Sequence, residues 1–134
     1  MSGPRSGTDA KVPPEPVFKV MVTFEHVGWH AWPQAPARRA YLRNDHRHLF
    51  KFKVELVAEH SDRAIELHDL KESCEAWAQA YYVAATTKSC EQMAFDLLRH
   101  VYRNFQPLSG RVECWEDGEC GGACEMTWKK ETTT

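Results

Sequence analysis

The sequence predicts an α+β fold in which an antiparallel sheet is covered on one face by two helices. Segments with the two-residue apolar period of strands flank two segments with the longer period of helices, in the order strand, strand, helix, helix, strand, strand. Strands and helices segregated in this way are typical of one layer of antiparallel strands and one layer of helices. The chain has 134 residues, of which 43% are hydrophobic, and this suffices for one domain with its own core.

Two strands are expected before the helices. Apolar residues recur at every second position over residues 18–24 and again over residues 48–57, as in a half-buried strand. The segment between them carries two prolines and the aromatic residues Trp29 and Trp32, together with His30. It is predicted to be a long loop with a functional role.

Two amphipathic helices are expected next. Apolar residues at helical spacing over residues 67–81 predict the first helix. The second has the start of a capping box, with Ser89 three residues before Gln92, and its apolar stripe continues to Phe105. Pro107 then ends it.

Two strands are expected after the helices. Residues 111–116 alternate between two faces, with Val112, Cys114 and Glu116 on the same one. A glycine-rich turn is predicted over residues 117–122, followed by a short last strand near residues 126–129. The four strands would form the antiparallel sheet, with both helices on one of its faces.

Composition limits where the protein acts and what it binds. Residues 1–16 are rich in Gly, Pro and Ser and predict a flexible leader, residues 131–134 predict a flexible tail, and residues 17–130 form the single domain. Neither a signal-peptide layout nor a bilayer-spanning apolar run is present, so a cytoplasmic protein is expected. A net charge of -2 predicts neither nucleic acid nor a membrane as partner.

A pair of histidines opens the second predicted strand. By strand alternation, His46 and His48 share a face with Phe50, so both imidazoles point toward the core. Burying titratable groups is costly unless something binds them, and a metal is the usual reason for paired histidines on one face. A hydrogen-bonded core histidine beside a partly exposed one is the alternative.

The chain has 5 cysteines, an odd number that argues against a disulfide framework. Three of them, Cys114, Cys120 and Cys124, are a second possible metal site. Structural zinc sites usually have closer cysteine pairs and a fourth ligand, so free reduced thiols are the favoured interpretation.

The motifs taken together resemble the family of 6-pyruvoyltetrahydropterin and 6-carboxytetrahydropterin synthases. The resemblance covers most of residues 17–124 and depends on the following motifs: Phe24-Glu25, His30-Ala31-Trp32-Pro33, His46-Arg47-His48, Ile65 to Lys71, Ser89-Cys90-Glu91, and Glu116. It implies the tunnelling fold (T-fold), β-β-α-α-β-β, whose subunits join their sheets into an oligomeric barrel with active sites between subunits.

The resemblance also implies a set of site residues. The family holds a zinc ion with three histidines, which here would be His30, His46 and His48, with His26 as the alternative to His30. Glu116 matches the glutamate that anchors the pterin. Ser89 stands where the family usually has the threonine before its second helix.

The sequence departs from the family where protons are transferred. The catalytic cysteine of the family is replaced by Leu42, and the segment 77–88 contains neither member of its Asp-His dyad. A positioned base contributes about 10²–10⁴ in rate, so its loss would matter. Asp45, His68 and Asp69 are weak candidates for a replacement base, although such residues are most often solvated surface groups.

Two functions of different classes are therefore expected. One is a zinc-dependent carbon-oxygen or carbon-carbon lyase acting on 7,8-dihydroneopterin triphosphate or a related pterin, in a tetrahydropterin or 7-deazaguanine (queuosine-type) pathway. The other is a zinc- and pterin- or purine-binding protein without the family's chemistry.

Two further features have two interpretations each. Trp29 and Trp32 would form a lid over a stacked heterocycle or pack against a neighbouring subunit. Arg38 and Arg39 would bind a triphosphate or remain in solvent.

Overall fold

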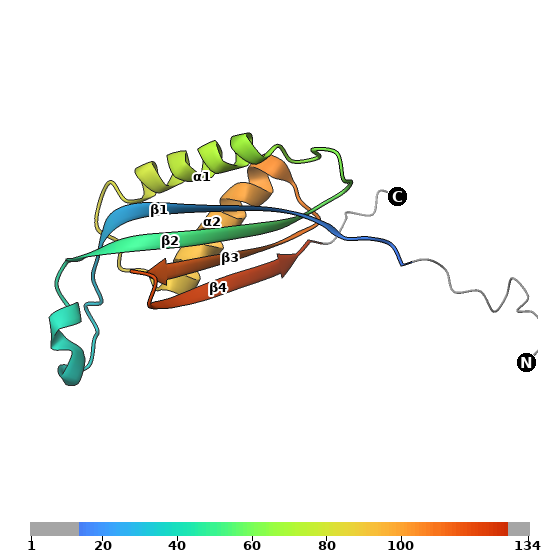
Figure 1. Ribbon diagram of the computed structural model, residues 1–134. Helices are drawn as coiled ribbons and strands as arrows, with labels where there is room; N and C mark the ends of the chain where they lie inside the picture. Colours follow the sequence, from blue (N-terminus) through green and yellow to red (C-terminus); the bar gives the residue numbers. More distant parts are fainter. Residues whose placement is uncertain (1–13, 129–134) are drawn as a thin grey trace, which may run out of the picture.

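A computed structural model describes residues 14–128 (Figure 1). The predicted tail over residues 131–134 lies outside the described residues, as does the predicted leader except for residues 14–16, which are exposed and without regular structure. The elements, in chain order, are β1 (Phe18–His30), the 3₁₀ helix η1 (Ala37–Leu42), β2 (His46–Ala58), α1 (Leu67–Tyr81), α2 (Cys90–Phe105), β3 (Ser109–Glu116) and β4 (Cys120–Thr127).

The predicted fold class is confirmed. The strands form one antiparallel sheet in the order β1-β2-β3-β4, so each strand pairs with its neighbours in sequence. Helix α1 packs on β1, whereas α2 packs on β3 and β4, and the two helices contact each other. Figure 1 shows α1 and α2 on the same side of the sheet. No helix among the described residues is both long enough and apolar enough to cross a membrane.

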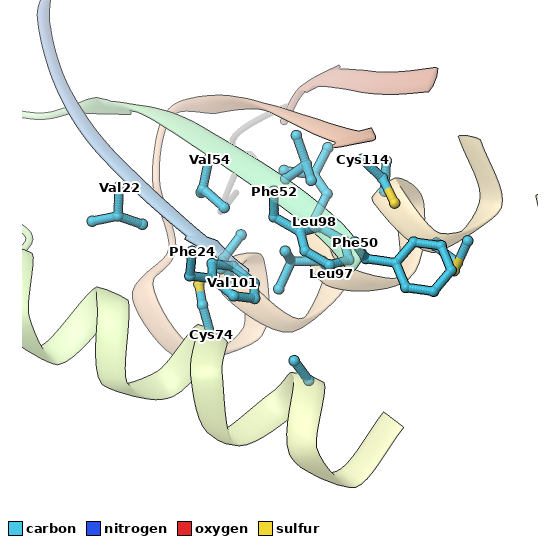
Figure 2. Packing of buried hydrophobic residues seen from close by; sticks show 14 of the residues in the cluster. Val22, Phe24, Phe50, Phe52, Val54, Cys74, Leu97, Leu98, Val101 and Cys114 are labelled. Carbon is cyan, nitrogen blue, oxygen red and sulfur yellow. The ribbon is translucent and has the colours of Figure 1, made fainter. Parts of the chain in front are cut away.

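The buried face of the sheet forms the core with the two helices. Phe50, Phe52, Val54 and Leu56 alternate along β2 and are at most 2% exposed. They meet the apolar stripe of α2, in which Met93, Leu97, Leu98 and Val101 have no exposed surface. Figure 2 shows Leu97, Leu98 and Val101 in one cluster with Phe50 and Phe52. The alternation in the sequence therefore identifies the inward face of β2, and His46 and His48 continue that face as half-buried residues at its beginning.

Helix α2 begins with the predicted capping box. The Ser89 hydroxyl accepts a hydrogen bond from the Gln92 N–H at 3.2 Å, and the Gln92 side chain accepts one from the Ser89 N–H at 2.9 Å. These two bonds satisfy backbone donors that the first turn of a helix leaves free. They also set where the chain enters α2, close to the histidine end of β2.

The first two strands are longer than predicted. They were expected over residues 18–24 and 48–57, but β1 and β2 pair over 13 residues each, and Trp29 and His30 belong to β1 rather than to a loop. The apolar alternation stops early in the sequence because the inward positions after Phe24 carry polar residues or glycine. The backbone ladder continues regardless.

The last strand was also misplaced. The predicted turn over residues 117–122 exists but spans only residues 117–119, and the last strand, expected near residues 126–129, already begins at Cys120. A Cβ on Gly121 would lie 2.4 Å from the Cys114 carbonyl oxygen, and one on Gly122 would lie 2.7 Å from the Glu91 carboxylate. These glycines therefore allow close packing within the sheet and against α2, and they do not form the turn.

Tyr82 holds the histidine ends of β1 and β2 against the helices. Its ring stacks on Phe50 with the centroids 4.9 Å apart and the planes at 13°. The ring also lies against Gly28, which pairs with His48 across the two strands. The Tyr82 ring fits there because Gly28 has no side chain.

Replacing Gly28 by Ala should therefore disturb this end of the sheet. A Cβ there would lie 2.5 Å from Cδ1 of Tyr82, so the ring must move. Overpacking of this kind lowers the free energy of unfolding by about 1–3 kcal/mol. Val27→Ala, at an exposed position next to Gly28, should cost less than about 0.5 kcal/mol. Urea denaturation measures both values, and equal losses would contradict the packing role of Gly28.

Candidate metal centre

Three histidines and one glutamate meet at one end of the sheet. His30 pairs directly with His46, and His48 lies two residues further along β2, on the same face. Glu116 ends β3 opposite Phe50, the next inward residue of β2. The strand register alone thus brings side chains from three neighbouring strands together.

The side-chain atoms converge closely. His30 Nδ1 lies 3.3 Å from His46 Nε2, and Glu116 Oε2 lies 3.1 Å from His48 Nε2 and 3.7 Å from His30 Nδ1. Each of the four residues offers one potential ligand atom, and all four atoms lie within 4.8 Å of one another. The side chains are half-buried, so the cluster is accessible from one side.

In each imidazole, the nitrogen that faces away from the cluster, called here the outer nitrogen, lies close to an oxygen atom. His30 Nε2 lies 2.8 Å from the Lys88 carbonyl oxygen, His46 Nδ1 lies 2.9 Å from the Asn44 carbonyl oxygen, and His48 Nδ1 lies 2.7 Å from Asp117 Oδ2. Carbonyl and carboxylate oxygens only accept hydrogen bonds, so each of these contacts is a hydrogen bond when the nitrogen carries the proton. A neutral imidazole then has a bare lone pair on its inner nitrogen, which is the tautomer that binds metals.

The donor set fits a divalent cation. Three lone pairs and a carboxylate face one another with no proton between them, which is unfavourable unless a positive charge lies among them. Burial lowers the pKa of His30, so this ring favours its neutral form at neutral pH. A proton on His48 could satisfy Glu116, but the short contact between His30 and His46 would still bring two lone pairs together. Three imidazole nitrogens and one carboxylate oxygen are ligands that zinc accepts.

The segment after α1 supports this end of the sheet. Thr86 forms a parallel bridge with His30: the Ala31 N–H donates to the Thr86 carbonyl at 3.0 Å, and the Thr86 N–H donates to the Trp29 carbonyl at 2.9 Å. These bonds place the carbonyl of Lys88 against the His30 ring. A segment without an Asp-His dyad therefore still has a role, which is to orient a candidate metal ligand.

A pocket of about 520 Å³ opens over the cluster, a size suited to a small heterocyclic ligand. Besides the histidines and Glu116, the residues that line it include Trp32, Gln34, Leu42, Thr87, Glu91 and Cys120. Leu42 contributes an apolar wall, whereas Gln34, Thr87 and Glu91 offer polar groups. The pocket thus combines the apolar surface and the few polar groups that bind a planar heterocycle.

The structure distinguishes between the two candidates for the first histidine. His26 also points inward from β1, but its ring stacks on Tyr82 with the centroids 5.4 Å apart. It therefore lies outside the cluster, which His30 joins. The two histidines have the same strand parity, so only the pairing of β1 with β2 separates them.

None of the three candidate bases lines the pocket. Asp45 is exposed just before β2, and no contact places it at the cluster. His68 and Asp69 lie in the first turn of α1, which follows the far end of β2, so they are at the opposite end of the sheet from the histidines (Figure 1). His68 instead contacts Glu66 at 2.9 Å.

The tryptophans and arginines between residues 29 and 39 differ in whether they line the pocket. Trp32 lines the pocket, whereas Trp29 points to the other face of β1 and is 51% exposed. Arg38 and Arg39 lie exposed in η1 and do not line the pocket in this single chain.

The candidate metal centre does not include Cys114, Cys120 or Cys124 as a ligand. Cys114 is buried, Cys120 is exposed and Cys124 is half-buried. Within residues 14–128, the group able to hold a metal consists of histidines and a glutamate. Only Cys120 of these three reaches the pocket.

Sequence reasoning missed the groups that orient the histidines. Two are backbone carbonyls, of Lys88 and Asn44, which leave no trace in residue type. The third is Asp117, whose carboxyl pKa is held below its ordinary value by the Leu49 N–H and by His48. Its place between Glu116 and Gly118 was a signal, but one that indicates only a turn.

Comparisons with known proteins support the fold. No protein-family model matches the sequence, and no curated protein matches it. The structure is similar to that of the Caenorhabditis elegans 6-pyruvoyl tetrahydropterin synthase, with a TM-score of 0.62 and 14% sequence identity over 84% of this chain and 97% of that chain. A catalytic-residue mutant of the Plasmodium vivax 6-pyruvoyltetrahydropterin synthase gives a TM-score of 0.64 and 10% identity over 85% of this chain and 100% of that chain. The chain therefore has the fold of these synthases.

Zinc should stabilise the protein through the two histidines of β2. At a free zinc concentration 100 times the dissociation constant, a single site raises the free energy of unfolding by about 2.7 kcal/mol. We expect this gain to disappear in the double variant His46→Ala, His48→Ala and to remain in His26→Ala, which removes a histidine of β1 outside the cluster. Denaturation with and without zinc measures the gain, and equal zinc stabilisation of the double variant would contradict the site.

Proposed function

We propose that this protein is a zinc-dependent, pterin synthase-like lyase that acts on 7,8-dihydroneopterin triphosphate or a related pterin, in a tetrahydropterin or 7-deazaguanine pathway. The observation that carries the proposal is the convergence of three imidazole nitrogens and a carboxylate at the wall of a pocket of about 520 Å³. The fold shared with two 6-pyruvoyltetrahydropterin synthases supports it.

His30, His46 and His48 would hold the zinc ion. When bound, zinc polarises a substrate hydroxyl or carbonyl and acidifies the adjacent C–H bonds. The hydrogen bonds to Lys88 and Asp117 keep two of the rings in orientation, with their inner nitrogens toward the pocket. The histidines thus need little reorganisation to bind the ion.

Glu116 would anchor the heterocycle. Its Oε2 faces His48 and His30, while a carboxylate has a second oxygen that can accept an N–H of a pterin ring. Trp32 lines the same pocket and offers an aromatic surface to a planar ligand. The anchor and the metal ligands are therefore close enough to act on one small molecule.

Proton transfer is the open requirement of this function. Leu42, which lines the pocket where the resembled family has a cysteine, cannot exchange a proton. Among the pocket residues outside the histidines and Glu116, the residues Cys90, Glu91 and Cys120 carry groups that can, whereas Asp45, His68 and Asp69 do not line the pocket. Leu42 is the observation that favours a second function, a zinc- and pterin-binding protein without turnover.

The decisive experiment is incubation of zinc-loaded protein with 7,8-dihydroneopterin triphosphate, followed by chromatography of the pterin products. The lyase predicts product formation that the double variant His46→Ala, His48→Ala abolishes. Stoichiometric zinc and bound pterin without product would reject the lyase in favour of the binding function. Failure to bind any pterin would reject both.

Glu116→Gln is the matched test of the anchor. Losing a hydrogen bond to a charged group costs about 1.5–3 kcal/mol, so pterin affinity should fall by about 10- to 100-fold. Glu113→Gln, which changes a carboxylate on the opposite face of β3, should leave it unchanged. Measuring zinc content in the same samples shows whether the loss arises at the ligand or at the metal.

We also propose that the protein forms homo-oligomers with intersubunit sites. Within the described sheet, β1 and β4 are the outer strands. Apart from the bridge of Thr86 to His30, the outer edge of each has no strand partner in this chain. Pairing β1 with β4 of another copy would satisfy the backbone groups of these edges. Light scattering coupled to size exclusion should give a mass of at least two chains of 15.4 kDa each, and a monomer at micromolar concentration would contradict the proposal.

A further inference from the structure

Asp117 connects the β3–β4 turn to the histidine end of β2. Its Oδ2 accepts a hydrogen bond from His48 Nδ1 at 2.7 Å, and its Oδ1 accepts one from the Leu49 N–H at 2.8 Å. Its own N–H donates to the Leu49 carbonyl at 2.8 Å. Three hydrogen bonds thus join this one residue to two consecutive residues of β2.

The backbone conformation explains how the carboxylate reaches β2. The β2–β3 pairing ends with Phe50 opposite Glu116, so Asp117 is the first residue beyond it. Its φ of 55° is left-handed, a conformation that Asp tolerates better than most residues. The side chain can then turn back toward β2, where its Oδ1 accepts the Leu49 N–H just beyond the last residue pair of β2 and β3.

His48 has two neutral tautomers, and its neighbours favour different ones. A proton on Nδ1 donates to Asp117 and leaves Nε2 bare toward the cluster. A proton on Nε2 would donate to Glu116, 3.1 Å away, and that ring could not bind a metal. The tautomer that Asp117 favours can therefore bind a metal through Nε2, whereas the tautomer that Glu116 favours cannot.

We infer that Asp117 is a positioning residue, which holds His48 in the tautomer and ring orientation that point Nε2 into the cluster. The metal part of this inference rests on the proposed function; the selection of the tautomer does not. Carboxylate partners of this kind commonly determine metal affinity by about 10- to 100-fold. Lys88 and Asn44 contact the other two rings through neutral carbonyls, so His48 is the ring whose partner can be removed by mutation.

Asp117→Asn is the sharpest variant. Asn also tolerates the left-handed conformation, but it has one acceptor oxygen, and its amide nitrogen donates. It therefore cannot accept from both the Leu49 N–H and His48 Nδ1. Asp117→Gly, which suits the same φ and removes the side chain, is the second variant. Glu119→Gln is the control, because it removes a negative charge from the same turn without a side-chain contact to the histidines.

Two measurements test the inference. Nitrogen NMR of the zinc-free protein reads the His48 tautomer: we expect Nδ1–H in the parent and in Glu119→Gln, and a shift to Nε2–H in Asp117→Asn and Asp117→Gly. Competition with a chromophoric chelator reads the zinc dissociation constant, which should rise about 10- to 100-fold in the Asp117 variants only.

The possible outcomes are distinct. An unchanged His48 tautomer in both Asp117 variants overturns the inference, even if zinc affinity falls. A changed tautomer with unchanged zinc affinity also overturns it, because positioning would then have no effect on the site. If the parent binds no zinc but the tautomer shifts as expected, the proposed function fails and the positioning role stands.

Discussion

The register between β1 and β2 is the constraint on which the rest of the structure depends. Strand side chains alternate with a period of two, so a slip by one residue would turn His30 to solvent and expose the inward face of β1. The same register sets Gly28 opposite His48 and leaves room for the Tyr82 ring. Core packing and the candidate metal centre are therefore specified by one set of backbone pairings, and a slip in that register would disrupt both.

Much of the fold could be predicted because the periods in the sequence are strong. The inward face of β2, both helices and the cap at Ser89 follow from local patterns, and so does the shared face of His46 and His48. Where the pattern fails, a physical reason is visible. Gly121 and Gly122 indicate a turn in the sequence, yet they lie in β4, where neighbouring atoms leave no space for a Cβ and glycine is therefore required.

The candidate site was less predictable than the fold. His26 and His30 have the same parity in one strand, and only the tertiary pairing shows which of them meets the pair in β2. The partners of the outer nitrogens are harder still, because a backbone carbonyl such as that of Lys88 can belong to any residue type. The family resemblance supplied the ligand set, whereas the atoms that orient it become visible only in three dimensions.

The spacing of the site residues along the chain has a consequence for how the site assembles. His30 and His46 are 16 residues apart within one hairpin, whereas Asp117 is 69 residues beyond His48. Closing the longer loop costs only about 1 kcal/mol more chain entropy, but it must await the helices and β3. During synthesis the three histidines can therefore come together before Glu116 and Asp117 have been added to the chain. A metal ion captured early would act as a folding template for the hairpin, and the carboxylates would then complete the site.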